Sequence, residues 1–379
     1  MGPLACQQSA RSGNIPVAAL PHSGHLTMNI LITGGCGFIG TALVYRLLRQ
    51  STDSVINVDK LTYASNPHAL EDLLPHPRYV FCRVDICDAE ALAETFVVHS
   101  PDLVVHLAAE THVDRSIDDP RPFVQSNCVG TSVLLHEVLR YWRTLPEEKR
   151  QRFRFHHVST DEVFGSVPEG RFFTEDSPLN PSSPYAATKA ASDHLVWSWH
   201  GTYGLPILVS YSSNNFGPRQ FPEKLIPVTL ARALSGQPVL LYGKGEQQRD
   251  WLYVEDHVDA LLAVLHHGRP GRAYNVATGV LRRNVDVVTA VCAELDRRQP
   301  RRQGPYRDLI RLVDDRPAHD RRYALDTSRI RDELGWRPAT DFSAGLAGTV
   351  AWYLENTEWQ DAMEKGQYRG ERLGLGLPA

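Results

Sequence analysis

The stretch that decides the fold is Asn29–Gly40, NILITGGCGFIG, in which a run of apolar residues leads directly into spaced glycines. The run predicts a buried strand over Asn29–Thr33, and the apolar periodicity that follows predicts a helix over Thr41–Gln50. Glycines between a strand and a helix let the backbone approach a diphosphate closely, and the helix N-terminus supplies N–H donors to it. The loop therefore predicts a dinucleotide-binding site.

Short apolar runs and helical stretches alternate from Met28 to residue 213. Further strands are expected over Val55–Asp59, Tyr79–Asp85, Asp102–Ala109, Phe153–Thr160 and Leu205–Ser213. Helices are expected over Asp88–Val98, Val129–Trp142 and Tyr185–Tyr203. This alternation predicts an α/β fold with a doubly wound parallel sheet of the Rossmann type.

The alternation breaks down after Asn214, where prolines become frequent. A helix over Ile226–Leu234 and a strand over Val239–Tyr242 are expected there, whereas Trp251–Leu265 and Tyr274–Val276 read as a return to the sheet. We predict an NAD-binding domain of residues 28–213 and 251–278. A smaller, discontinuous substrate domain of residues 214–250 and 279–379 should cover the carboxyl edge of the sheet, where ligands bind. Residues 1–27 lack periodicity and are predicted to be a disordered extension.

Composition narrows the class of protein further. The 379 residues are 42% hydrophobic and 22% charged, which is ordinary for a globular protein, and the net charge of −4 argues against a nucleic-acid partner. Six cysteines without CxxC pairs predict reduced thiols and no metal site, and no export signal precedes them. No apolar run reaches about 18 residues, so no membrane span is expected. These features predict a cytoplasmic protein.

Asp59 closes the second predicted strand, where a carboxylate would bind the adenosine ribose hydroxyls of the dinucleotide. A carboxylate there repels a 2′-phosphate, so NAD is predicted in preference to NADP. The adjacent Lys60 weakens that preference.

A second set of chemical groups lies at Ser183–Lys189, SPYAATK. Ser183 and Pro184 predict a helix start, as N-cap and first helical residue. Tyr185 and Lys189 then lie one turn apart on one face and can reach the same ligand. A phenol is a poor base near neutral pH, but a neighbouring ammonium and the positive nicotinamide ring would stabilise the phenolate. This pair predicts a base that takes a hydroxyl proton while a hydride leaves.

Asp161 and Glu162 follow the strand that ends in Ser159-Thr160. Eliminating water across two carbons needs a base for the carbon-bound proton and an acid for the departing hydroxyl. Two carboxyl groups with differently tuned pKa values can divide these roles. Two exposed turn acids are the alternative interpretation of the dipeptide alone.

The chain resembles the nucleoside-diphosphate-glucose 4,6-dehydratases, and within them the dTDP-glucose 4,6-dehydratase family, a branch of the extended short-chain dehydrogenase/reductases. The resemblance extends from Ile30 to Tyr368. It rests on the motifs GGCGFIG (34–40), HLAAETHVDRSI (106–117), VSTDEVFG (158–165), PSSPYAATKA (181–190), SNNFGPRQFPEKLIP (213–227), YGKGEQQRDWLYVEDH (242–257) and DRPAHDRRYALD (315–326).

The resemblance implies a role for each catalytic residue. Tyr185 would start oxidation at C4 of the sugar, with Lys189 tuning it and binding the nicotinamide ribose. Thr160 would hydrogen-bond the C4 oxygen, Glu162 would remove the C5 proton and Asp161 would protonate the leaving C6 hydroxyl. Return of the hydride to C6 would regenerate NAD and give the 4-keto-6-deoxy sugar nucleotide.

The resemblance also implies the binding residues. The cofactor would contact Gly34, Gly37, Phe38, Ile39, Gly40, Asp59, Lys60, Asp85, Ile86, Leu107, Ala108, Ala109, Tyr185 and Lys189. The nucleotide sugar would contact Thr111, Asn214, Glu223, Lys224, Leu225, Arg249, Asn284, Arg316, His319 and Tyr368. Arg249 and Arg316 would bind its diphosphate. A homodimer formed through the helices Val129–Trp142 and Tyr185–Tyr203 is also implied.

Several positions depart from the family pattern. Cys36 replaces an alanine, Thr111 replaces a serine, and the run 277–284 replaces a Gly-Gly-x-x-Glu loop. These departures leave the nucleotide base and the sugar open, including a UDP-sugar. A 4-epimerase or decarboxylase of the same fold is an alternative, although the paired acids argue against an epimerase. A non-catalytic NAD-binding scaffold is the alternative from another class.

Overall fold

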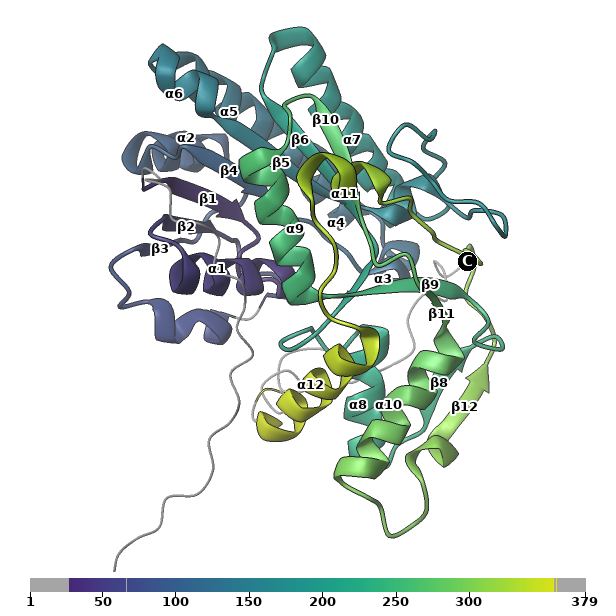
Figure 1. Cartoon of the computed structure of the whole chain (residues 1–379). Helices are drawn as coiled ribbons and strands as arrows, with labels where there is room; N and C mark the ends of the chain where they lie inside the picture. Colours follow the sequence, from purple (N-terminus) through teal and green to yellow (C-terminus); the bar gives the residue numbers. More distant parts are fainter. Residues whose placement is uncertain (1–26, 66, 358, 360–379) are drawn as a thin grey trace, which may run out of the picture.

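The computed structural model describes residues 27–65, 67–357 and 359. It forms a larger lobe around a parallel sheet and a smaller lobe at one end of that sheet (Figure 1). The predicted extension, apart from its last residue, and the predicted substrate residue Tyr368 lie outside the described residues.

The larger lobe is organised by seven strands in the order β10-β6-β5-β4-β1-β2-β3, and all six pairings are parallel. The strands are β1 (Asn29–Thr33), β2 (Ser54–Val58), β3 (Tyr79–Cys82), β4 (Leu103–His106), β5 (Arg154–Thr160), β6 (Ile207–Ser212) and β10 (Arg272–Val276). In register, Ile30 of β1 lies beside Val55 of β2 and Leu103 of β4. The strand order therefore reverses at β1, which opens a crevice at the carboxyl ends of β1 and β4.

Helices cover both faces of this sheet. On one face, α2 (Ala89–His99), α5 (Thr131–Thr144) and α7 (Pro184–Tyr203) share a core with Leu31, Val104 and Phe155. On the other, α1 (Phe38–Gln50) and α9 (Val254–His267) pack on Ile30 and Val105. Burial of each such aliphatic side chain stabilises the fold by about 1.5–3 kcal/mol. The predicted doubly wound α/β fold is confirmed.

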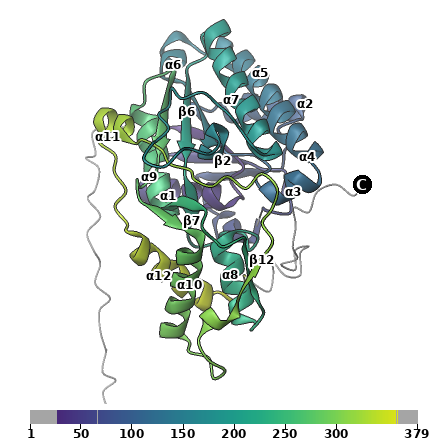
Figure 2. The ribbon, with the colours of Figure 1, turned by 90° about the vertical axis from the view of Figure 1, so that its right-hand side faces the viewer.

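The smaller lobe lies below the large sheet in Figure 2. It has its own apolar core. Its helices are α8 (Leu225–Leu234), α10 (Asn284–Arg298) and α12 (Phe342–Glu355). Its strands form two small sheets, β11-β9-β7 and β12-β8, from β7 (Asn214–Phe216), β8 (Val239–Tyr242), β9 (Gln248–Tyr253), β11 (Leu281–Arg283) and β12 (Ile310–Val313). In contrast, Ile330 of α11 (Ser328–Leu334) packs in the core that includes Tyr274 of β10. The predicted domain limits remain a prediction.

Short helical elements connect these parts. They are η1 (Pro67–Leu73), α3 (Val113–Asp118), α4 (Arg121–Phe123), η2 (Val124–Gly130), α6 (Glu147–Arg152), η3 (Asp161–Phe164) and η4 (Tyr306–Leu309).

Several predicted boundaries are wrong; the helix predicted from Thr41, for example, starts at Phe38. The strands expected over Tyr79–Asp85 and Asp102–Ala109 stop at Cys82 and His106, because the chain leaves the sheet there to form the wall of a cavity. The helix expected to start at Val129 instead continues from α4 through η2, a π-helical turn over Val124–Gly130. Such turns insert one residue into a helix and often occur at functional sites.

Membrane spans, metal sites and cysteines can be judged for the described residues. Among these residues, no helix is long and apolar enough to cross a membrane. The same part of the chain holds no group of His, Cys, Asp or Glu side chains placed to bind a metal ion. Its cysteines, Cys36, Cys82, Cys87, Cys128 and Cys292, are free thiols.

Candidate active site

The glycine loop lies against the end of β4. Gly34 has a φ of +76°, and a Cβ there would lie 2.7 Å from the backbone nitrogen of Ala108, so only glycine fits. Its own N–H donates to the carbonyl of Val58 at 2.9 Å. Gly37 precedes α1 without any side-chain cap, which leaves the first N–H groups of this helix for a ligand.

The carboxylate of Asp59 holds the same loop from the end of β2. It accepts hydrogen bonds from the N–H of Cys36 at 3.0 Å, from the N–H of Leu61 at 2.8 Å and from the hydroxyl of Ser65 at 3.1 Å. A carboxylate has about four acceptor positions, so one position remains for a ligand hydroxyl. Lys60 lies 3.4 Å from Asp85, and this ion pair offsets the positive charge beside Asp59.

A cavity of about 330 Å³ lies between the glycine loop and α7. Its volume falls in the range of ligand sites. Among its lining residues are Gly34, Gly37, Phe38, Ile39, Gly40, Asp59, Lys60, Ile86, Leu107, Ala108, Ala109, Thr111, Thr160, Glu162, Tyr185 and Lys189. The structure thus brings the predicted cofactor residues together, with the exception of Asp85, which does not line the cavity. The free acceptor position of Asp59 and the uncapped start of α1 fit a dinucleotide.

Helix α7 presents Tyr185 and Lys189 to this cavity. Ser183 caps the helix as predicted, because its hydroxyl accepts from the N–H of Ala186 at 3.1 Å. The ammonium of Lys189 donates to the carbonyl of Val158 at 2.9 Å. Burial lowers the pKa of Lys189 to about 8, while the nearby charge of Asp193 opposes that change. Lys189 thus keeps its charge near neutral pH.

The phenol of Tyr185 is not tuned as a base by its protein neighbours alone. Burial raises the pKa of Tyr185 well above its usual value, and the charge of Glu162 raises it further. A hydrogen bond with the hydroxyl of Thr160 acts in the opposite direction. The predicted lowering of this pKa is therefore not produced by the side chains around the phenol.

Asp161 and Glu162 form the start of η3, directly after β5. Burial raises the pKa of Asp161 well above its usual value, and the adjacent charge of Glu162 raises it further. Burial also raises the pKa of Glu162, but Arg316, Arg249 and Lys224 oppose that effect. The two pKa values therefore differ in how far their surroundings raise them: that of Asp161 is raised well above its usual value, whereas the cations around Glu162 oppose the effect of burial.

The two carboxyl groups also differ in access. Glu162 lines the cavity described above and a second cavity beside it, whereas Asp161 lines neither and is 2% exposed. The Oδ1 atom of Asp161 accepts from the hydroxyl of Thr160 at 3.3 Å, and its Oδ2 atom is buried without a partner among the described residues.

The second cavity, of about 220 Å³, lies between the lobes. The predicted substrate residues that line it are Asn214, Glu223, Lys224, Leu225, Arg249, Asn284, Arg316 and His319. Three buried polar atoms of these residues have no hydrogen-bond partner in the described structure: Oδ1 of Asn214, Oδ1 of Asn284 and Nε of Arg316. Since buried polar groups are normally paired, these atoms indicate a polar ligand.

Sequence reasoning missed several residues of both cavities. Ser126 lines the first cavity from the π-helical turn, and Asn127 beside it bonds the backbone of Glu110 and the hydroxyl of Thr188. His112 and Asp114, on the loop and helix after β4, line the second cavity. His112 and Asp114 both lie within the motif HLAAETHVDRSI (106–117), which is the one sequence signal that points to them.

Comparison with known proteins shows the family to which the chain belongs. Residues 31–349 match the family model described as GDP-mannose 4,6 dehydratase. dTDP-glucose 4,6-dehydratase 1 of Escherichia coli K12 is 51% identical over 351 residues, which covers 90% of this chain and 97% of the relative. The dTDP-glucose 4,6-dehydratase of Neisseria meningitidis serogroup B is 50% identical, with 92% and 99% covered. This chain belongs to the dTDP-glucose 4,6-dehydratase family.

Solved structures of dTDP-glucose 4,6-dehydratases have a fold similar to that of this chain. The dTDP-glucose 4,6-dehydratase DesIV of Streptomyces venezuelae, with NAD and the ligand TYD bound, has a TM-score of 0.81 at 40% identity, covering 89% of this chain and 100% of that one. The Bacillus anthracis enzyme in complex with NAD has a TM-score of 0.79 at 38% identity, with the same coverage. The UDP-glucose 4-epimerase of Thermotoga maritima has a TM-score of 0.76 at 28% identity, so epimerases share the fold.

Proposed function

We propose that this protein catalyses the NAD-dependent 4,6-dehydration of dTDP-glucose to its 4-keto-6-deoxy product. The observation that carries this proposal is the pair Asp161 and Glu162 at the end of β5, with their pKa values separated by their surroundings. An acid and a base on adjacent residues, beside Tyr185 and Lys189, supply what an oxidation followed by an elimination requires.

In the proposed reaction, Tyr185, Glu162 and Asp161 each transfer a proton. Tyr185 takes the proton of the C4 hydroxyl, and Thr160 binds the same oxygen. A ketone at C4 makes the C5 proton acidic, so Glu162 can remove it only after oxidation. Asp161 then protonates the C6 hydroxyl, which leaves as water. When C6 receives the hydride, Glu162 returns its proton to C5. NAD, when bound, supplies the hydride acceptor for C4 and the hydride donor for C6.

The residues around the first cavity would hold that cofactor. The N–H groups at the start of α1 would bind the diphosphate, and the carboxylate of Asp59 would bind the adenosine ribose. Lys189 would bind the nicotinamide ribose and, as a cation, stabilise the phenolate of Tyr185.

The second cavity would hold the nucleotide sugar, since it adjoins the first through Glu162, Asn214, Glu223, Lys224, Leu225 and Trp251. Arg249 and Arg316 would bind the diphosphate through charge-assisted hydrogen bonds. The guanidinium of Arg249 is already ordered, because it donates to the carbonyls of Gln248 and Asp320 and stacks 4.0 Å from the ring of Tyr323.

A product assay on a substrate panel tests this proposal. The NAD-loaded protein is incubated with dTDP-, UDP-, GDP- and CDP-glucose and with UDP-N-acetylglucosamine, and the 4-keto-6-deoxy sugar is measured. We expect product from dTDP-glucose and none from the Tyr185→Phe variant, which should still bind NAD. A product from another nucleotide alone would correct the base while leaving the reaction standing.

Three alternatives would not give the 4-keto-6-deoxy product in the same assay. A 4-epimerase would give the C4 epimer without the keto product, and a decarboxylase would act only on a sugar acid. A scaffold would bind NAD but turn over no sugar nucleotide. Any of these outcomes would reject the dehydratase.

We also propose a cytoplasmic homodimer that acts in deoxysugar biosynthesis. Exposed apolar side chains on η2 and α7, namely Val124, Val129 and Tyr203, support a dimer through this flank of the larger lobe. Sedimentation at micromolar concentration should give twice the mass of the chain, and a monomer would contradict the dimer.

A further inference from the structure

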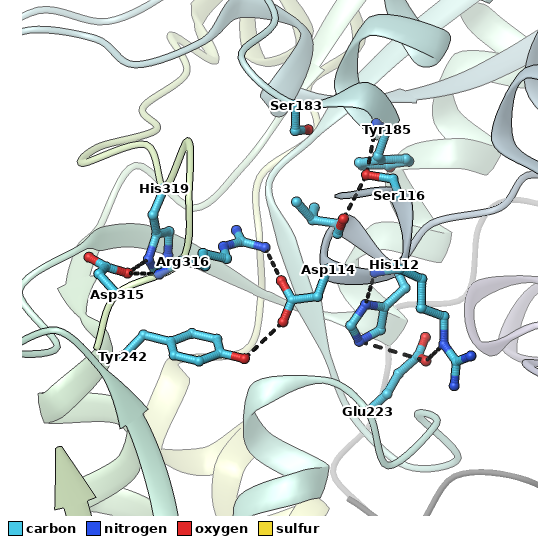
Figure 3. Close-up of polar contacts among 12 residues, drawn as sticks. His112, Asp114, Ser116, Ser183, Tyr185, Glu223, Tyr242, Asp315, Arg316 and His319 are labelled. Atoms are coloured by element: carbon cyan, nitrogen blue, oxygen red, sulfur yellow. Dashed lines mark hydrogen bonds and ion pairs between the residues drawn. The ribbon is translucent and has the colours of Figure 1, made fainter. Parts of the chain in front are cut away.

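The carboxylate of Asp114 joins the two lobes at the second cavity (Figure 3). Its Oδ1 atom accepts from Nη1 of Arg316 at 2.5 Å, and its Oδ2 atom accepts from the hydroxyl of Tyr242 at 3.0 Å. Asp114 lies on α3, beside the large sheet, whereas Tyr242 ends β8 and Arg316 follows β12 in the smaller lobe. One side chain therefore orients two groups that come from a different part of the chain.

Arg316 is oriented with most of its five guanidinium donors unused. The ion pair occupies Nη1, while Nε is buried and has no partner among the described residues. No hydrogen bond from Nη2 to these residues is present either. In a planar guanidinium, Nε and Nη2 form one edge with two parallel donors, which matches the oxygens of a phosphate. That edge remains available while Asp114 holds the opposite corner.

We infer that Asp114 is a positioning residue of the nucleotide-sugar site, which fixes Arg316 and Tyr242 so that the free edge of the guanidinium is preset for a diphosphate. The inference rests on the proposed function, because it takes the ligand to be a nucleoside diphosphate. Ordering a long side chain before the ligand arrives removes part of the entropy loss of binding.

A carboxylate near a diphosphate also repels it, and geometry decides which effect is larger. A phosphate on the Nε–Nη2 edge is in direct contact with the guanidinium, while Asp114 lies beyond it at the Nη1 corner. Because the Coulomb energy falls with distance, the attraction at contact exceeds the repulsion. Arg249 and Lys224, which line the same cavity, add further positive charge.

Calorimetry on the NAD-loaded protein tests the inference, with dTDP and UDP as ligands. In Asp114→Ala, the dissociation constant of the diphosphate should rise roughly tenfold, which corresponds to the ordering cost of about one long side chain. In steady state, KM should rise by a similar factor, with kcat within about threefold of the parent. Asp114→Asn should retain most of the affinity, because its amide oxygen can accept from Arg316 and its amide nitrogen can donate to Tyr242.

A matched control and a double variant separate positioning from a general loss of structure. Asp119→Asn changes a carboxylate that follows α3 and pairs with the exposed Arg121, and it should leave affinity unchanged. In an Arg316→Ala background, Asp114→Ala should weaken binding by less than about twofold, since its effect passes through Arg316.

Four results would overturn the inference. Tighter binding in Asp114→Ala would mean that Asp114 competes with the diphosphate for Arg316, and unchanged binding would mean that it has no role. An equal loss in the Arg316→Ala background would leave only a structural role. If the parent binds neither diphosphate, the proposed function fails and the inference fails with it. Parent binding together with an unaffected Asp114→Ala variant rejects the inference alone.

Discussion

The carboxyl group of Asp161 is close enough to that of Glu162 for the charge of Glu162 to raise the pKa of Asp161. Glu162 in turn is stabilised as an anion by Arg316, Arg249 and Lys224. Burial raises the pKa of both adjacent residues, but three cations oppose this effect at Glu162, whereas the charge of Glu162 adds to it at Asp161. The cations that are expected to bind the diphosphate also help to assign the acid and the base.

Glu162→Gln should stop the reaction after oxidation. Without a base for the C5 proton, reduced cofactor should accumulate on the protein, and turnover should fall by roughly 10²- to 10⁴-fold, as for loss of other general bases. Near-ultraviolet absorbance of the reduced nicotinamide measures this accumulation.

Asp161→Asn is the matched variant for the acid. Turnover should also fall, but Glu162 should still exchange the C5 proton with solvent, and deuterium should enter C5 in heavy water. Glu162→Gln should show no such exchange. Exchange in Glu162→Gln and not in Asp161→Asn would reverse the assignment.

The rate should decrease as the pH rises through about 8. The pKa of Lys189 is lowered to about 8, so the ammonium is charged below this pH and neutral above it. In the proposed mechanism, loss of its charge removes the cation that would stabilise the Tyr185 phenolate when NAD is bound. Because Asp193 raises the pKa of Lys189, Asp193→Asn should move the alkaline limb of the kcat profile to lower pH. An alkaline limb that stays in place would show that Lys189 does not set it.

Asp59→Asn should weaken NAD binding by roughly 10- to 100-fold, the range expected when a hydrogen bond to a charged group is lost. The preference for NAD over NADP should shrink as well, because the repulsion of a 2′-phosphate disappears. Quenching of intrinsic fluorescence measures both affinities. Lys60→Met is the control, and it should affect NAD less, since Lys60 pairs with Asp85.

Stability should fall in mild acid because histidines are buried in the neutral form. Burial lowers the pKa of His156 to about 3 and that of His257 to about 3, against an unfolded value of about 6.5. The unfolded chain therefore binds more protons below pH 6.5, and stability is lost as the pH falls from there. Each histidine should account for about 2 kcal/mol of the free energy of unfolding at pH 5.

Urea unfolding at pH 7.5 and pH 5 measures this loss. His156→Gln can keep a hydrogen bond to Ser210, the partner of His156 at 3.0 Å, and should reduce the pH dependence. An equal loss in the parent and the variant would exclude His156 as a source.

The sequence alone was enough for most of the larger lobe. The strand at Asn29–Thr33 and the helix start at Ser183 are confirmed, because continuous apolar runs and an N-cap followed by proline are strong local signals. The π-helical turn at Val124–Gly130 was missed, since its geometry depends on packing against α7 and leaves no periodicity of its own.

The site was predicted less completely for a similar reason. Motif resemblance located Arg316, but its partner Asp114 lies 202 positions earlier, and no local pattern links residues so far apart. The three-residue strands β7 and β11 are likewise too short for an alternating pattern to develop.

The path of the chain through the large sheet has a consequence for folding. After β6 the chain leaves to build β7, α8, β8 and β9, and it returns only with α9 and β10, the strand at the sheet edge. The edge of the sheet next to β6 therefore stays open until the connecting part of the smaller lobe has been synthesised. The two lobes cannot complete themselves one after the other in the order of synthesis. The parallel sheet is complete only once the chain has passed through this part of the smaller lobe and returned as β10.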